Sequence, residues 1–463
     1  MNIINVTEIT KSYTERKLFD KASFYLQERE KVGVIGINGT GKSTLLKIIA
    51  GIEEPDEGQV IKANHVVVRY LPQNPAFDPE HTVLETVLYQ CSRHYVGGDL
   101  EKRDTTDVTI GAADQWNLES DAKSMMTKLG IMNFNQKAGE LSGGQRKRLA
   151  LVAALLLPCD VLVLDEPTNH LDAAMADWLE AYLKKWRGAL IMVTHDRYFL
   201  DSVCNRIVEV DKGSIYSYDA NYSGYLELKA EREDMQQASE RKRQTILRKE
   251  LEWIRRGARA RTTKQKGRIQ RYESLKNQSG PQTDQAVEIS SVSSRMGRTT
   301  VELDGISKSY DGRTLIRDFT YIFLKNDRIG FVGANGSGKT TLMKMIDGRI
   351  LPDSGTVTIG QTIKIGYYTQ EIETSKEAGL AYMDPEEKVI DYIKNTAEYV
   401  RTKDGLVSAS NMLEQFLFPS SQQYSPIGKL SGGEKRRLNL LRVLMEAPNV
   451  LILDEPTNDL DTR

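Results

Sequence analysis

Two glycine-rich segments of this chain contain the residue types that bind nucleotide phosphates. Residues 36–43 read Gly-Ile-Asn-Gly-Thr-Gly-Lys-Ser, and residues 333–340 read Gly-Ala-Asn-Gly-Ser-Gly-Lys-Thr. In such a loop the glycines let backbone N–H groups point at phosphate oxygens, the lysine reaches the β- and γ-phosphates, and the last hydroxyl ligates Mg²⁺. The residues expected to bind ATP are Gly36, Asn38, Gly39, Gly41, Lys42, Ser43 and Thr44, and then Gly333, Asn335, Gly336, Gly338, Lys339, Thr340 and Thr341.

An Asp-Glu pair follows each glycine-rich segment, directly after four apolar residues. The pairs are Asp165-Glu166 and Asp454-Glu455. An aspartate at the end of a buried strand can hold a metal ion through water, and the adjacent glutamate can polarise an attacking water as a general base. We therefore expect the two aspartates, with the loop hydroxyls of Ser43 and Thr340, to hold Mg²⁺, and Glu166 and Glu455 to be catalytic.

The motifs occur twice in the same order at a nearly constant offset. Residue 333 follows residue 36 by 297 positions, and Gln370 follows Gln73 by the same 297 positions. The two Leu-Ser-Gly-Gly segments, which contain Ser142 and Ser431, are 289 positions apart, as are the two glutamates of the Asp-Glu pairs. This spacing indicates a duplicated domain, with eight fewer residues between the glutamine and the Leu-Ser-Gly-Gly segment in the second copy.

Five further side chains are candidates because of their position. Gln73 and Gln370 follow strand-like runs and can sense Mg²⁺ or the attacking water. His195 ends another apolar run, 29 residues after the first Asp-Glu glutamate, and can hydrogen-bond the γ-phosphate. Tyr13 and Tyr310 each end a Lys-Ser-Tyr segment and can stack on adenine. A structural histidine and surface tyrosines are the competing interpretations.

The elements that must position these residues can be read from short apolar runs. Residues 32–36 and 161–164 are typical of buried parallel strands. Each glycine-rich loop is expected between such a strand and an apolar helix, at 43–50 in the first copy and 340–346 in the second. Strand, loop and helix in that order is the context a phosphate-binding loop requires. The predicted class is therefore α/β, with two P-loop nucleotide-binding domains.

Composition narrows the possible classes of protein. The chain has 463 residues and a net charge of −1, so no global field indicates a partner. Its three cysteines form no metal-ligand or disulfide pattern, which fits a reducing compartment. The longest apolar run, 149–157, is far shorter than the roughly 20 residues of a membrane span. The first residues lack the pattern of a signal peptide, and we expect a cytoplasmic protein.

The segment between the two copies differs in composition. We expect a first domain at 1–225, a charged helical linker at 226–299 and a second domain at 300–463. Residues 255–276 contain nine basic residues and one acidic residue, which is too lopsided for a helix laced with ion pairs. We predict two long helices around a basic tip that starts near Gly257 and ends near Gly267, and we expect the lysines and arginines of this tip to bind phosphates. The candidate RNA-binding residues are Arg255, Arg256, Arg259, Arg261, Lys264, Lys266, Arg268 and Arg271.

These motifs resemble those of the ATP-binding-cassette family, and the resemblance covers both halves. Leu-Ser-Gly-Gly followed by Gln145 or Glu434 is similar to the signature of that family. The resemblance implies that the signature of one cassette completes the nucleotide site of the other, so the two cassettes would pair within one chain. Ser431 and Gly433 would close the first site, and Ser142 and Gly144 the second.

The second copy departs from that pattern at its end. The chain ends at Arg463, nine residues after Asp454, and all five histidines lie in the first half. A second histidine matching His195 is expected 29 residues after Glu455, which is beyond the last residue. We therefore expect the second domain to be incomplete and the chain to be a fragment of a longer protein.

Within the family, the arrangement resembles the ABC-F subfamily. Two cassettes are joined by a charged linker, and residues 167–172 and 456–461 read Pro-Thr-Asn-His-Leu-Asp and Pro-Thr-Asn-Asp-Leu-Asp. The stretch 253–264 is similar to the Uup-like branch. The resemblance implies a ribosome-associated ATPase whose linker reaches transfer RNA. The alternatives are an ATPase subunit of a transporter, a DNA-associated ATPase and an antibiotic-resistance ribosome protection factor.

Overall fold

The computed structural model describes most of both halves of the chain. The described residues are 1–13, 16–73, 75–91, 93–96, 99–102, 112–156, 158–255, 300–310, 312–369, 382–402, 405–454 and 456. Gln370, Glu455 and the basic residues from Arg256 to Arg271 lie outside these ranges, and so does the predicted return helix of the linker. Among the described residues, no helix is both long and apolar enough to cross a membrane.

The first half contains two sheets. Strands β1 (Asn2–Tyr13), β2 (Arg16–Gln27) and β4 (Glu57–Lys62) form an antiparallel sheet in the order β2-β1-β4. The larger sheet has the order β11-β10-β3-β9-β8-β5-β6-β7, and its central pairs from β10 to β5 are parallel. Its strands are β3 (Lys31–Ile35), β5 (Val68–Leu71), β6 (Arg93–Val96), β7 (Asp99–Lys102), β8 (Val161–Asp165), β9 (Ala189–Val193), β10 (Arg206–Asp211) and β11 (Ser214–Tyr218).

The buried strands of the larger sheet separate two hydrophobic cores. Because successive strand residues point to opposite faces, Val161 and Val163 of β8 enter one core while Leu162 and Leu164 enter the other. The first core lies between the two sheets and contains α1 (Lys42–Ala50). The second is covered by helices that include α2 (Val83–Cys91), α3 (Ala112–Lys128), α4 (Gly143–Leu156), α5 (Ala173–Lys185) and α6 (Arg197–Val203). The α/β fold and the two predicted parallel strands are confirmed.

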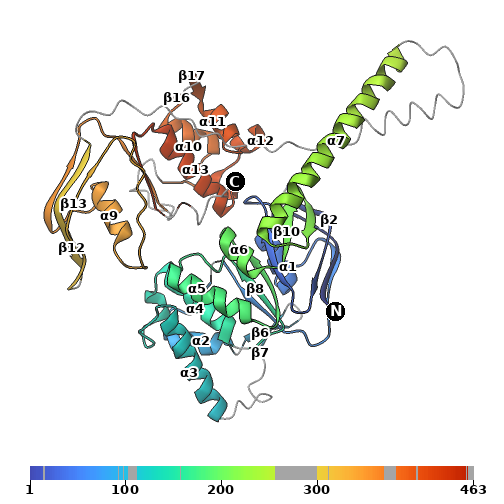
Figure 1. Cartoon of the computed structure of the whole chain (residues 1–463), viewed down its shortest axis with the longest axis horizontal. Coiled ribbons are helices and arrows are strands. Elements are labelled where there is room, and N and C mark those ends of the chain that lie inside the picture. Colours follow the sequence, from blue (N-terminus) through green and yellow to red (C-terminus); the bar gives the residue numbers. More distant parts are fainter. Residues whose placement is uncertain are drawn as a thin grey trace, which may run out of the picture.

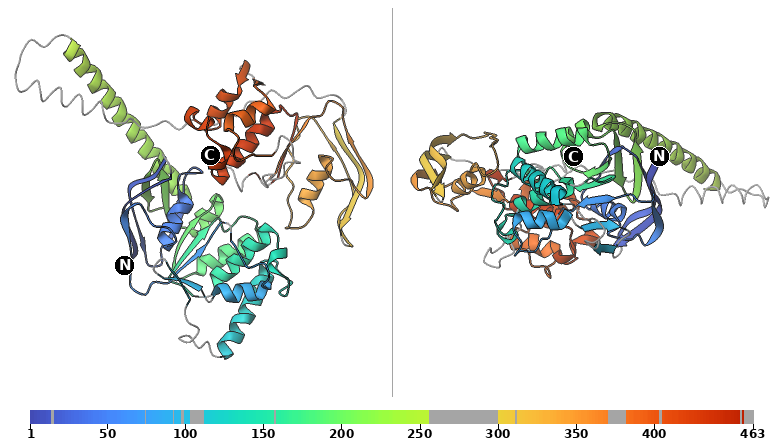
Figure 2. Two further views of the ribbon diagram at one scale, coloured as in Figure 1. Left: turned by 180° about the vertical axis from the view of Figure 1, so that it is seen from behind. Right: turned by 90° about the horizontal axis from the view of Figure 1, so that it is seen from below.

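A single long helix leaves the first half. Helix α7 (Tyr222–Arg255) has 34 residues and covers the first part of the predicted helical linker, residues 226–255. Figures 1 and 2 show it projecting from the first half as a stalk. It spans about 50 Å at 1.5 Å per residue. Its last residue, Arg255, is the first of the basic stretch, so the helix leads from the cassette to the predicted tip.

The second half repeats the first only in part. Strands β12 (Val301–Tyr310), β13 (Arg313–Phe323) and β14 (Ser354–Ile359) form an antiparallel sheet in the order β13-β12-β14. The parallel pair β15 (Ile365–Tyr368) and β18 (Val450–Leu453) corresponds to β5 and β8. The other elements are β16 (Tyr399–Thr402), β17 (Gly405–Ser408), α9 (Lys339–Ile346), α10 (Val389–Thr396), α11 (Ala409–Gln415), α12 (Ser420–Gln423) and α13 (Gly432–Met445).

The strand expected before the second glycine-rich loop is not formed. Residues 328–332, which match β3 at the 297-residue offset, pair with no strand among the described residues. In the first half β3 hydrogen-bonds to β9 and β10, and both of these follow Asp165 in the chain. No strand among the described residues of the second half takes the place of β9 or β10 beside 328–332. The consequence is visible in exposure, because Val32 is 0% exposed whereas its counterpart Ile329 is 40% exposed.

Matched glycines in these two segments give a direct test of the difference. A Cβ on Gly33 would lie 2.7 Å from Leu200 Cδ2 and 3.0 Å from Ile207 Cδ1, whereas a Cβ on Gly330, its counterpart, would meet no atom within 4 Å. We expect Gly33→Ala to lower the free energy of unfolding of the first cassette by about 1–3 kcal/mol through overpacking. Gly330→Ala should leave thermal unfolding unchanged. Equal shifts for both variants would contradict the described packing.

Candidate active site

The first glycine-rich loop connects β3 to α1 in a conformation that only glycine tolerates well. Gly39 has φ 83° and Gly41 has φ 103°, both in the left-handed region. A Cβ on Gly36 would lie 2.5 Å from the carbonyl oxygen of Val210. The loop therefore passes tightly against β10 and ends at the N-terminus of α1, where backbone N–H groups and the helix dipole favour anions.

The loop lysine donates to the carbonyl of the first loop glycine in both halves. Lys42 is buried, and its Nζ donates to Gly36 O at 2.5 Å and to Asn38 Oδ1 at 3.2 Å. Lys339 Nζ donates to Gly333 O at 2.8 Å. Each ammonium group thus lies within its own loop, at the position from which it can contact phosphate oxygens.

A buried pair of carboxylates ends β8 beside this loop. Asp165 accepts a hydrogen bond from Ser43, and burial raises its pKa although that bond and the charge of Lys147 oppose the rise. Burial and the neighbouring Asp165 also raise the pKa of Glu166. Among the described residues, Asp165 Oδ1 and Glu166 Oε2 are buried without a hydrogen-bond partner. Such oxygens are available for a metal-bound or attacking water.

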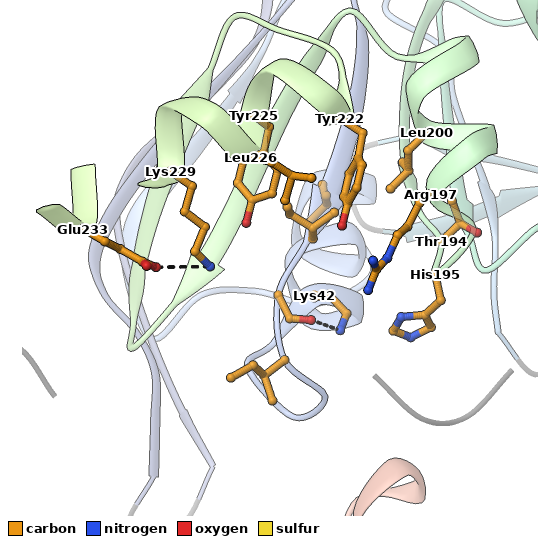
Figure 3. Close-up of a pocket in the computed structure, with 14 residues that line it drawn as sticks. Lys42, Thr194, His195, Arg197, Leu200, Tyr222, Tyr225, Leu226, Lys229 and Glu233 are labelled. Atoms are coloured by element: carbon orange, nitrogen blue, oxygen red, sulfur yellow. Dashed lines mark hydrogen bonds and ion pairs between the residues drawn. The ribbon is translucent and has the colours of Figure 1, made fainter. Parts of the chain in front are cut away.

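His195 lies close to the expected general base. It follows β9, and its Nε2 is 3.2 Å from Glu166 Oε1. The preceding Thr194 has its hydroxyl 2.7 Å from that of Thr168, which ties the segment after β9 to the segment after Glu166. Figure 3 shows His195 and Lys42 on the same side of the pocket. The structure therefore brings together the loop lysine, the carboxylates and the histidine.

The two candidate adenine-stacking tyrosines occupy matching positions. Tyr13 ends β1, is exposed, and hydrogen-bonds to Glu53 and to Thr44 of α1. Tyr310 ends β12 and is also exposed. In the first half, Asp56 Oδ2 accepts from the backbone N–H of the serine before Tyr13 at 2.8 Å, and Asp353 repeats this contact before Tyr310 at 2.8 Å.

The second copy of the carboxylate site is only partly described. Thr340 Oγ1 is 3.3 Å from Asp454 Oδ1, which matches the contact of Ser43 with Asp165. Thr341 lies on α9 beside Thr340. Glu455 and Gln370 lie outside the described residues. Gln73 is described and exposed just after β5, and its side chain makes no hydrogen bond to the described residues.

Sequence reasoning missed two kinds of residue at this site. Tyr70 Oη lies 3.5 Å from Asp165 Oδ2, and Tyr367 Oη lies 3.4 Å from Asp454 Oδ2. These tyrosines are 297 positions apart, so the same offset that identified the glutamines could have identified them. Lys147 is buried on α4 near both carboxylates of the first site. The second copy has a basic residue, Arg436, at the 289-residue offset of the signature segments, and this repeated basic position could have identified Lys147.

The two signature segments lie at helix N-termini. Ser142 precedes α4, and its backbone N–H donates to Gln145 Oε1 at 2.9 Å. Ser431 caps α13 and forms a capping box with Glu434. A helix N-terminus with free N–H groups favours an anion such as a γ-phosphate.

Contacts connect the first and second halves at these segments. A Cβ on Gly433 would lie 3.2 Å from Asn38 Cβ, so the second signature touches the first glycine-rich loop. Asn335 Nδ2 of the second loop donates to His170 O at 2.8 Å. His170 Cβ in turn lies 3.2 Å from the Cβ position of Gly144 in the first signature. His170 therefore contacts both the first signature and the second loop.

The residues of the first site fit a magnesium ion bound together with a nucleotide. Mg²⁺ in such sites keeps several waters and uses one or two protein oxygens plus substrate phosphates. Ser43 and the partnerless oxygen of Asp165 are of this kind. Among the described residues, no group of three or more His, Cys, Asp or Glu side chains could hold a metal alone. The Ser43 hydroxyl and the Asp165 carboxylate suit a metal that arrives with phosphates.

Comparison with known proteins identifies the family. A family model described as "ABC transporter" matches residues 19–169 and 316–458, and a second model with the same description matches 208–289. An uncharacterised ABC transporter ATP-binding protein, YfmR of Bacillus subtilis (strain 168), is 47% identical over 100% of this chain and 75% of its own length.

Other relatives bear a name from translation. The energy-dependent translational throttle protein EttA of Mycobacterium tuberculosis is 37% identical over 99% of this chain and 84% of its own length. EttA of Escherichia coli (strain K12) is 36% identical over 93% of this chain and 80% of its own length. Together with the paired motifs and the buried carboxylates, these matches show that the chain is an ATP hydrolase of the ATP-binding-cassette family and belongs to its ABC-F subfamily.

Proposed function

We propose that this ATPase binds Mg²⁺ and ATP in two sites shared between its cassettes and uses the cycle to control a contact with the ribosome. The proposal that both cassettes contribute to one site rests on the contact between Gly433 and Asn38. This contact brings the second signature against the first glycine-rich loop. The ribosomal part is supported by the similarity to the EttA proteins, which are named energy-dependent translational throttle proteins. The proposal places the protein in the cytoplasm, where ribosomes act.

In the first site, each group has one task. The loop Gly36–Ser43, with Asn38, Gly39, Gly41 and Lys42, holds the phosphates, and Thr44 supports Tyr13 against adenine. Ser43 and Asp165, with Gln73, would hold Mg²⁺, which supplies charge neutralisation for the phosphates when bound. Ser431 and Gly433 close the site from the second cassette.

Hydrolysis at this site needs a base and a fixed water. The buried Glu166 carboxylate, next to a carboxylate and close to His195, can accept a proton from a water that attacks the γ-phosphate. His195 keeps Glu166 Oε1 in place and can donate to a phosphate oxygen. Lys42 and the loop N–H groups stabilise the charge that develops during phosphoryl transfer.

The second site has the same plan. The loop Gly333–Thr340, with Asn335, Gly336, Gly338 and Lys339, would hold the phosphates, and Tyr310 would stack on adenine. Thr340, Asp454 and Gln370 would serve Mg²⁺, Glu455 would be the base, and Ser142 and Gly144 would close the site. The contact of Asn335 with His170, which itself touches Gly144, supports this pairing.

The linker supplies the contact with RNA in this proposal. The cassettes are assigned to residues 1–225 and 300–463, and the linker to 226–299. Helix α7 spans about 50 Å and ends at Arg255, the first residue of the basic stretch in the sequence. Lys and Arg on such a tip bind transfer-RNA phosphates with release of counterions, so binding weakens as salt rises.

Sedimentation of the intact protein tests this proposal. The protein carrying Glu166→Gln and Glu455→Gln should cosediment with ribosomes in a sucrose gradient when ATP is present. Gln at the eight basic residues from Arg255 to Arg271 should abolish cosedimentation, whereas Gln at the exposed Lys185 and Arg187 of the first cassette should not. An ATP-loaded protein that stays at the top of the gradient at low salt would rule out the ribosomal role.

A further inference from the structure

The first three turns of α7, residues 222–232, form one wall of the first nucleotide site. These turns are called the root of the helix, and α7 is called the stalk helix. A pocket of about 360 Å³ lies beside the glycine-rich loop. Figure 3 shows the first turns of α7 above it, with Tyr222 and Tyr225 facing the side where Lys42 and His195 lie. The lining thus combines loop residues, the segment after β9, and helix residues such as Leu226 and Lys229. The same helix that leads to the basic tip borders the phosphate end of the site.

A buried carboxylate on β10 holds this root in place. Glu209 is 0% exposed. Lys229 Nζ lies 2.5 Å from Glu209 Oε1, and an Arg232 guanidinium nitrogen lies 3.0 Å from Oε2. Tyr225 Oη donates to Oε1 at 3.1 Å and Tyr218 Oη donates to Oε2 at 3.3 Å. Three of these four partners belong to the first three turns of α7, so one buried carboxylate binds three side chains of these turns.

The four bonds to Glu209 are stronger than ordinary hydrogen bonds because their acceptor is a carboxylate. Two are ion pairs and the other two are tyrosine hydrogen bonds to the same carboxylate, and aromatic rings pack around them. The guanidinium of Arg232 lies 3.9 Å from the centroid of the Tyr216 ring, and Tyr218 packs edge-on against Tyr225 with centroids 5.1 Å apart. Burial, followed by the charge of Glu209, raises the pKa of Tyr218 to about 12, so its hydroxyl remains a donor. Removing one partner of such a buried set leaves the others uncompensated.

The strand that carries this carboxylate lies against the glycine-rich loop. Glu209 pairs with Ile35 in the parallel ladder of β10 and β3, and Gly36 is the next residue of the loop. The carbonyl of Val210, the residue after Glu209, is the atom that a Cβ on Gly36 would meet at 2.5 Å. If phosphate binding shifts the loop backbone, either β10 must move with the loop or Gly36 must separate from the Val210 carbonyl.

We propose that Glu209 is a positioning residue that couples the first nucleotide site to the linker. It clamps the root of α7, through Lys229, Arg232 and Tyr225, to the strand that touches the glycine-rich loop. Nucleotide binding at that loop thereby changes the stability and direction of the stalk helix. This inference rests on the proposed function, because it assumes that the glycine-rich loop binds ATP and that the linker contacts RNA.

Hydrogen–deuterium exchange on the intact chain tests the coupling. The peptide to follow covers residues 222–236, measured with and without ATP in a Glu166→Gln background that prevents turnover. Without the Glu209 change, ATP should slow exchange in this peptide. With Glu209→Gln, exchange should be faster and the difference caused by ATP should be lost, while calorimetry shows ATP still bound. Glu231→Gln, an exposed glutamate on the same helix, should behave like the background protein.

The outcomes separate the possible roles. A purely structural Glu209 would lower the melting temperature equally with and without ATP and leave the ATP-dependent difference in exchange intact, which would overturn the proposal. If Glu209→Gln does not fold, Lys229→Met with Arg232→Met tests the same bonds from the helix side, where both side chains are nearer the surface. If the background protein binds no ATP, the proposed function fails. If it binds ATP without any change in the 222–236 peptide, only the coupling fails.

Discussion

Replacing Glu166 by Gln should slow ATP hydrolysis at the first site by about 100- to 10,000-fold, the range that a general base contributes. Gln has the size of Glu and can still face His195, whose Nε2 is 3.2 Å from Glu166 Oε1. It cannot accept a proton from the attacking water. ATP binding should therefore survive, and the nucleotide should remain trapped between the cassettes.

The measurement is single-turnover hydrolysis of labelled ATP in a Lys339→Met background, which removes the second site. Glu140→Gln, an exposed glutamate just before the first signature, is the control and should hydrolyse at the normal rate. Turnover that falls less than about tenfold in Glu166→Gln would show that another group takes the proton, because a lost base costs more.

Replacing Lys42 by Met should weaken ATP binding at the first site by about 10- to 100-fold, since a hydrogen bond to a charged group contributes about 1.5–3 kcal/mol. The ammonium group lies inside the loop, on Gly36 O and Asn38 Oδ1. Met keeps the apolar stem but removes the charge that faces the phosphates. Folding should be little affected, because Met fills the space of the lysine stem and both acceptors belong to residues that are only partly buried.

Calorimetry with ATP checks this prediction, again with Lys339→Met to silence the second site and Glu166→Gln to stop turnover. Lys47→Met makes the same chemical change five residues later on α1 and should leave the affinity as it was. If Lys42→Met binds ATP as tightly as Lys47→Met does, the loop does not hold the phosphates.

Much of the site was predictable because the chain repeats itself. The constant offset identified both glycine-rich loops, both Asp-Glu pairs and both signatures, and the apolar runs around them predicted β3, β8, α1 and α9. Local pattern is sufficient here because a phosphate-binding loop is built from consecutive residues. The same offset would have identified Tyr70 and Tyr367, which contact the two aspartates.

Other features depend on partners that local pattern does not contain. Residues 328–332 have the apolar run of a strand, yet they form none, because a strand in the middle of a sheet needs neighbours on both sides. The clamp of Glu209 joins a strand to a helix 20 residues later, and no periodicity marks it. The contact of Gly433 with Asn38 joins residues from different halves and followed only from the family resemblance.

A disulfide between the first loop and the second signature tests the central claim, that one chain builds a nucleotide site from both cassettes. The Cβ position of Gly433 is 3.2 Å from Asn38 Cβ, close to the roughly 3.5–4.5 Å of a disulfide. Burial raises the pKa of Cys159 and of Cys204 to about 12, so neither thiol should compete. Cys91 is replaced by Ser in all variants.

The protein carrying Asn38→Cys and Gly433→Cys, in the Glu166→Gln background, is oxidised mildly with and without ATP and run on a non-reducing gel. We expect a cross-link within one chain, with the mobility of a looped monomer, that forms faster with ATP. Asn38→Cys with Gly432→Cys is the matched control and should cross-link poorly, because a Cβ on Gly432 meets no atom within 4 Å. Cross-links that form only between two chains, or that the Gly432→Cys control forms equally well, would contradict the central claim.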